Sequence, residues 1–139
     1  MITSRKSLKK QKPTRRRGAL VVEMAFVLPI LVTVIFACLE FSRMNMIRNT
    51  AKNAAYKAAR KAIVPGATAA GAQTEATNLM HSIGVNDSTV TIIPPVITSG
   101  TMTVTVNIQT NLSGNLFFAP MFLKNKSITT TCTLNREDY

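Results

Sequence analysis

The sequence predicts an α+β fold. A long N-terminal transmembrane helix with an amphipathic stem precedes a small domain with one helix and about three antiparallel strands. Three observations lead to this prediction. Residues 19–39 are 21 consecutive residues whose only charge is Glu23, and alanines recur at helical spacing over residues 51–62. Beyond residue 88, apolar residues alternate with threonine and other polar residues, which is typical of strands with one wet face.

The first element is a basic leader. The 139 residues include 17 Lys and Arg against 6 Asp and Glu, and 8 of the basic residues lie before residue 18. Without this leader the formal net charge falls from +11 to +3. The charge therefore belongs to a short tail, which argues against a nucleic-acid-binding domain. Residues 1–17 have too few apolar side chains to bury a core, and we expect them to be disordered.

The second element is the apolar run of residues 19–39. At 1.5 Å per residue it is long enough to cross a hydrocarbon core of roughly 30 Å. It exceeds the usual apolar region of a secretory signal peptide, roughly 7 to 15 residues, and it carries Glu23 at its fifth position. A lipoprotein signal is the alternative, because Ile35-Phe36-Ala37-Cys38 approximates the pattern around a lipidated cysteine.

The basic residues on the two sides of this run predict its orientation. Eight precede it, including three consecutive arginines at its edge, and six follow shortly after it. Positively charged residues favour the cytoplasmic side of a membrane. We therefore expect a cytoplasmic N-terminus and a C-terminal domain outside the cytoplasm.

The third element is a helical stem that continues the same helix over residues 40–64. Its narrow apolar face is made of small residues, which allow another backbone to approach closely. Two partners fit this face: the chain's own C-terminal domain or neighbouring subunits. Pro65-Gly66 is expected to end the helix. The residues placed on the apolar face are Phe41, Met44, Ile47, Ala51, Ala54, Ala55, Ala58, Ala59 and Ala62.

The remaining residues, 65–139, predict a small exported α+β domain. A second helix is expected over Thr68–Ile83, ending at Gly84. Strands are expected around Val90 and Ile92, over residues 101–109, and over residues 128–134. The long connection from Ser113 to Lys126 is expected either to cap the sheet or to form an exposed contact patch. Its apolar residues are Leu116, Phe117, Phe118, Met121, Phe122 and Leu123.

Residue types that support catalysis or metal binding do not form a recognisable pattern. His81 is the single histidine, and no Cys, Asp or Glu stands at metal-ligand spacing from it. Cys38 lies inside the apolar run and Cys132 in a Thr-rich segment far from it in the sequence, so we expect no disulfide between them. We therefore expect no enzymatic activity, no catalytic, cofactor-binding or metal-binding residues, no cofactor, and neither a small-molecule substrate nor nucleic acid as a partner.

The informative motif lies where the leader meets the apolar run. Gly18 follows three arginines and would place a small, flexible residue at the membrane surface, within reach of a membrane-embedded protease. Cleavage after Gly18 would make Ala19 the new N-terminus and Glu23 the fifth residue. A carboxylate at this depth costs about 2 to 3 kcal/mol, so it needs a partner. The new amine lies one helical turn away on the same face.

This motif resembles the prepilin cleavage site of type IV pilin-like proteins, in which glycine precedes the cut and glutamate stands five residues after it. The basic leader, Val22-Glu23, Leu28-Pro29 and the exit Glu40-Phe41-Ser42-Arg43 are more narrowly similar to TadE-like pseudopilins of tight-adherence (Flp) pilus assembly systems. The alanine-rich stem also fits this family, and residues 15–62 carry most of the resemblance.

The resemblance implies a minor pseudopilin that acts in assembly of a tight-adherence (Flp-type) pilus or a related secretion apparatus. Gly18 and Ala19 would form the processing site, Glu23 would act in assembly, and Pro29 would bend the helix. The implied partners are a prepilin peptidase, other pilin-like subunits that contact the N-terminal helix, and the lipid bilayer. The implied location is the inner (cytoplasmic) membrane, crossed once. The alternative function is a membrane-anchored or lipid-anchored envelope binding protein.

The resulting domain prediction has four parts. Residues 1–18 form a basic cytoplasmic leader and residues 19–39 the transmembrane helix. Residues 40–64 form the stem, and residues 65–139 the small exported domain.

Overall fold

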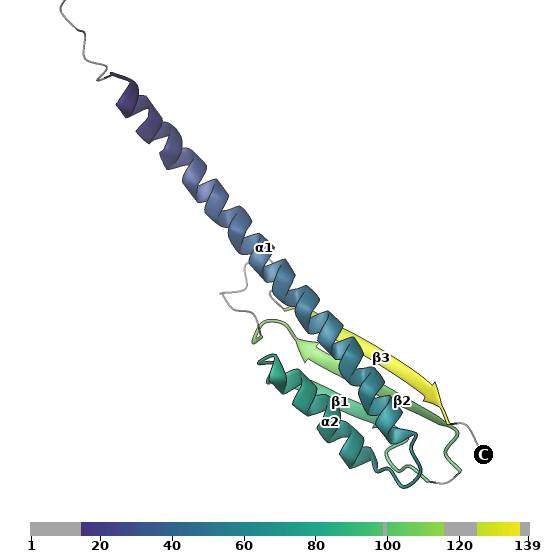
Figure 1. Cartoon of the computed structure of the whole chain (residues 1–139). Helices are drawn as coiled ribbons and strands as arrows, with labels where there is room; N and C mark the ends of the chain where they lie inside the picture. The colour runs from purple at the N-terminus through teal and green to yellow at the C-terminus, as the bar shows by residue number, and fades with distance from the viewer. Residues whose placement is uncertain (1–14, 99, 116–124, 137–139) are drawn as a thin grey trace, which may run out of the picture. The chain divides into compact units, whose positions relative to one another are not determined.

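The computed structural model describes residues 15–98, 100–115 and 125–136 (Figure 1). Its elements are α1 (Arg15–Ala62), α2 (Ala69–Ser82), β1 (Ser88–Ile93), β2 (Thr103–Asn111) and β3 (Ser127–Asn135). The predicted α+β class, with one long helix, a second helix and three antiparallel strands, is confirmed. The chain divides into two compact units, Met1–Ile35 and Phe36–Tyr139, and α1 contributes to both.

Helix α1 begins earlier than the sequence predicts. It starts at Arg15, so the expected disorder is wrong for residues 15–17, while residues 1–14 lie outside the described residues. Gly18 is helical as well, rather than part of a flexible junction. The physical reason is that arginine is a good helix former, and extending an existing helix by one turn avoids the cost of a new nucleus.

The buried face of the stem differs from the predicted apolar face at its beginning. From Ile47 the helical spacing leads back to Arg43 and Glu40, which are 5% and 3% exposed, whereas Phe41 is 47% exposed. Phe41 is therefore wrongly placed on the buried face, because it points to another side of the helix. From residue 51 onward the prediction is confirmed, since every alanine of the stripe is buried.

Helix α2 is capped at both ends by its own sequence. Thr68 is the N-cap, and its hydroxyl accepts a hydrogen bond from the amide of Gly71 at 3.1 Å. At the C-terminus, Gly84 has φ +73°, and its amide donates to the carbonyl of His81 at 2.8 Å. The amide of Val85 donates to the carbonyl of Met80 at 3.2 Å, which completes a Schellman motif. Val85 and Met80, the positions at which an apolar contact frequently accompanies this motif, are both buried in the core cluster.

The sheet is antiparallel, with strand order β1-β2-β3. Val90 pairs with Ile108, and Ile108 pairs with Thr130, so one face carries the apolar residues of all three strands. The opposite face carries Thr, Asn, Gln and Ser side chains together with Ile93. Met102, expected at the start of the apolar alternation, precedes β2 and is exposed.

The core of the second unit lies between one face of the sheet and the two helices. Its buried residues come from the alanine stripe of α1, from Ala72, Ala76 and Met80 of α2, and from the apolar face of the strands. Two partners were considered for the alanine stripe of the stem. The structure shows that the stripe packs on the chain's own domain. The apolar residues predicted as a cap or contact patch over residues 116–123 lie outside the described residues.

Candidate membrane-spanning segment and its site residues

The first half of α1 exposes apolar side chains on all sides. Every residue from 18 to 35 is exposed, and the most apolar 18-residue window has a mean hydropathy of 2.6 with none of it buried. A helix that packs on a soluble domain has one apolar stripe, whereas this segment is apolar all round. Such a surface fits an apolar environment supplied by lipid or by other helices. Among its exposed large side chains are Leu20, Val21, Val22, Met24, Phe26, Ile30 and Val34.

Gly18 and Ala19 lie at the start of this segment, and both are exposed. Gly18 is the fourth residue of α1, so its amide is among the four N–H groups that have no acceptor within the helix. Glycine also lowers helix stability by about 1 kcal/mol relative to alanine. Unwinding the first turn to expose the Gly18–Ala19 peptide bond therefore breaks few hydrogen bonds.

Glu23 lies one helical turn after Ala19, and its side chain is exposed. Side chains of a helix lean toward its N-terminus, so the carboxylate extends over the turn that contains Ala19. Among the described residues, no hydrogen bond or ion pair involves Glu23. The structure thus brings Ala19 and Glu23 to one face without giving the carboxylate a partner in the described chain.

Pro29 lies inside α1, about three turns after Gly18 and Ala19. Proline has no amide hydrogen, so it cannot donate to the carbonyl of Ala25. The Thr33 hydroxyl donates to the carbonyl of Pro29 at 2.9 Å, so this carbonyl accepts a bond from a side chain. The carbonyls of Ala25 and Pro29 both depart from the regular helical hydrogen-bond pattern, and they lie one turn apart. The bend expected at Pro29 remains a prediction.

Arg43 was predicted as a charge after the span and as part of the exit Glu40-Phe41-Ser42-Arg43, but not as a buried hydrogen-bond donor. Its Nε donates to the carbonyl of Asn115 at 3.0 Å, and its Nη2 donates to the carbonyl of Ile83 at 2.7 Å. These bonds connect the stem to the C-cap of α2 and to the turn after β2. The carbonyl acceptors of Arg43 lie in segments far away in the sequence. The local sequence therefore contains no pattern that predicts a buried guanidinium at this position.

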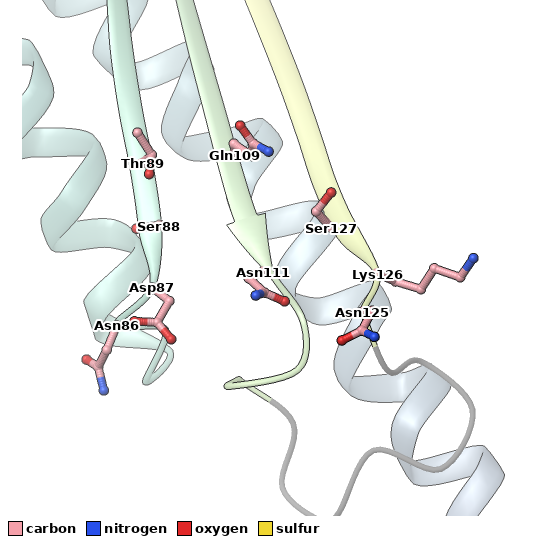
Figure 2. Close-up of a pocket in the computed structure, with 9 residues that line it drawn as sticks. All are labelled: Asn86, Asp87, Ser88, Thr89, Gln109, Asn111, Asn125, Lys126 and Ser127. Atoms are coloured by element: carbon pink, nitrogen blue, oxygen red, sulfur yellow. The ribbon is translucent and has the colours of Figure 1, made fainter.

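A polar pocket of about 610 Å³ lies at one end of the sheet (Figure 2). It is lined from the start of β1, the end of β2 and the start of β3 by residues with amide or hydroxyl side chains together with Asp87 and Lys126. Lys126 extends away from the other side chains. The pocket offers hydrogen bonds to a polar group. In the described part of the chain, no three His, Cys, Asp or Glu residues gather as metal ligands.

The described residues contain one helix that is long and apolar enough to cross a membrane, and it lies near the N-terminus. The class of protein defined by the fold and this helix is a single-pass membrane protein with a small folded domain. A family model described as TadE-like protein matches residues 18–60. The resemblance seen in the sequence is confirmed, because these residues are similar to that family.

The match begins at Gly18 and ends within the stem, so it covers the apolar half of α1 and most of its buried half. It includes Ala19, Glu23, Pro29 and Arg43. The family indicates a role in tight-adherence (Flp) pilus assembly, and TadE-like proteins are generally not enzymes. No curated protein matches the chain, and no solved structure matches it.

Proposed function

We propose that this chain is a minor pseudopilin that a prepilin peptidase cuts after Gly18 and that then acts in assembly of a tight-adherence (Flp-type) pilus or a related secretion apparatus. One observation carries the proposal. The TadE-like match coincides with a helix that is apolar and exposed in its first half and buried in a folded domain in its second half. Such a helix suits a subunit that presents its domain at a membrane and offers the apolar segment to other helices.

The position of Gly18 supports processing at this residue. It lies in the first turn of α1, where few intrahelical bonds oppose unwinding. A Cβ added at Gly18 would meet nothing within 4 Å in the described chain, so a larger side chain is compatible with the fold. Gly18→Leu should therefore insert and fold normally but resist cleavage, because the peptidase needs close access to the backbone. Cleavage of this variant at the normal rate would mean that the cut lies elsewhere.

The position of Glu23 supports a role in assembly. Its carboxylate is costly within a membrane, and the amine freed at Ala19 would offset that cost. The same amine on an adjacent subunit would also set the axial register of two neighbouring helices. An acidic side chain near the new helix N-terminus is additionally favoured by the helix dipole.

The experiment compares Glu23→Gln with Glu75→Gln, a change of the same chemistry outside the apolar segment. Both variants should insert, and both should be cut after Gly18. Glu23→Gln should lower crosslinking to pilin-like partners in the native membrane by about tenfold, as expected for loss of about 1 to 2 kcal/mol between helices. Glu75→Gln should leave crosslinking unchanged. If Glu23→Gln is cut, inserted and crosslinked like the unaltered chain, the assembly role of Glu23 is wrong.

The orientation is part of the same proposal, with the N-terminus in the cytoplasm and the domain outside it. The arginines before the span favour this orientation. A reporter enzyme that works only outside the cytoplasm, fused after Tyr139, should be active. Activity of a cytoplasm-only reporter at the same position would contradict the proposed orientation.

A further inference from the structure

The two edges of the sheet differ in how they are protected. Strand β1 is six residues long, is followed by Pro94 and Pro95, and its Val90 carbonyl accepts a hydrogen bond from Nε2 of Gln73 at 3.2 Å. Strand β3 is nine residues long and contains no charge, proline or glycine. Natural sheets usually protect an open edge with such residues or with a covering element. The β1 edge has this protection, whereas the residues of β3 itself do not provide it.

Among the described residues, no backbone hydrogen bond from outside the sheet reaches the outer edge of β3. Its described hydrogen bonds run toward β2, among them the contact between the hydroxyls of Thr105 and Thr133 at 2.9 Å. In an antiparallel edge strand, alternate residues direct their N–H and C=O groups away from the neighbouring strand. Over nine residues, about four of them present these groups outward. A further strand could pair with these groups.

A groove of about 550 Å³ lies along this edge. It is lined by Arg48 and Lys52 of α1 and by the four residues Thr129–Cys132 of β3. Thr130 and Cys132 lie on the core-facing side of β3 but are only half-buried. The groove therefore includes part of the core-facing side of β3 as well as its edge. A strand added at β3 would therefore lie beside the two basic side chains.

Arg48 and Lys52 have no acidic partner among the described residues. Both are exposed, and neither forms a described hydrogen bond or ion pair, whereas Lys61 on the same helix pairs with Glu75 at 3.1 Å. They are four residues apart, so they lie on one side of the helix with a rise of about 6 Å between them. Alternate side chains of an extended strand are about 6.8 Å apart, so two carboxylates at such positions match this spacing.

We propose that β3 and this groove bind an extended strand of a partner protein, added at the free edge of the sheet, with carboxylates at alternate positions that pair with Arg48 and Lys52. Backbone bonds to β3 would supply affinity, and the two basic residues would select the acidic strand. A second copy of this chain fits poorly at this edge, because β3 carries no acidic residue to face the basic pair. The inference concerns the second compact unit and does not depend on cleavage at Gly18 or on a role in a pilus.

The test uses the full chain in detergent micelles with Cys38→Ser, which leaves Cys132 as the single cysteine. The probe is a fluorescent nine-residue peptide of alternating Thr and Val with Glu at two alternate positions. Two control peptides carry Lys in place of Glu, or N-methyl groups on every amide. Fluorescence anisotropy should show that each control binds at least about tenfold more weakly than the acidic peptide. At saturation, the acidic peptide should slow alkylation of Cys132 at least about fivefold, since it covers the groove.

Two double variants with the same change in net charge test whether Arg48 and Lys52 are the residues that select the acidic peptide. Arg48→Glu with Lys52→Glu should reverse the preference, so that the Lys peptide binds more tightly than the Glu peptide. Lys57→Glu with Arg60→Glu changes two exposed residues of the same helix that lie outside this groove. This second pair should leave the preference for the acidic peptide unchanged.

Three results would overturn the inference. The acidic peptide could bind no better than its Lys or N-methylated version, which would exclude recognition of an acidic strand. It could bind without protecting Cys132, which would place its site elsewhere. Finally, the chain could sediment as a dimer that mild oxidation links through Cys132 of both copies, which would make a second copy the occupant of this edge.

Discussion

Replacement of Ala55 by leucine tests whether the alanine stripe is part of the chain's own core. Ala55 is fully buried in the cluster that joins the stem to α2 and the sheet. Leucine adds three carbon atoms where no surface is exposed, so the neighbouring side chains or the stem must move. Overpacking of this kind costs typically 1 to 3 kcal/mol, and we expect a loss of about 2 kcal/mol of stability in the second unit.

The assay is hydrogen–deuterium exchange of the full chain in detergent micelles, read on peptides from β2, the central strand. A loss of about 2 kcal/mol should increase exchange of the protected amides about 30-fold. Asn53→Leu is the matched control, because it introduces the same side chain at an exposed position of the same helix. Exchange in β2 that is equal for Ala55→Leu and Asn53→Leu would refute the argument that the stripe packs within the chain.

Three further predictions concern the same unit. Arg43→Met should destabilise it by about 3 kcal/mol, because two charged hydrogen bonds to carbonyls are lost, whereas Arg48→Met should have little effect on urea unfolding. Gly84→Ala should cost about 1 kcal/mol, because the residue after the C-cap of α2 has positive φ, and a comparison of urea midpoints would detect it. Lys61→Met should change stability by less than about 0.5 kcal/mol in the same titration, because the pair with Glu75 is half exposed and screened by water.

The helices and strands could be predicted because local periodicity determines them. Small residues at spacings of three and four predicted the buried face of the stem, and the structure buries all of them. Threonine alternating with Val and Ile predicted a strand with one wet face, as β2 has. Thr68, Pro65-Gly66 and Gly84 are local signals that predicted where helices begin and end.

Features that depend on residues far apart in sequence could not be predicted in this way. Phe41 was assigned to the buried face because it is apolar, whereas Arg43 lies there because carbonyls 40 and 72 residues away accept its hydrogen bonds. The groove at β3 likewise requires the stem to lie beside a strand more than 70 residues later in the chain. Gly18, Ala19 and Glu23 were found by motif, and their proposed roles involve a peptidase and neighbouring subunits.

The mass of the chain purified from the membrane of its native host tests the central claim most directly. The account predicts a single-pass membrane protein whose mature form begins at Ala19, because cleavage follows Gly18. Intact-mass and N-terminal analysis should therefore show a chain from Ala19 to Tyr139. A chain that still begins at Met1, or one that begins at a lipidated Cys38, would contradict the account and favour a membrane-anchored or lipid-anchored envelope protein.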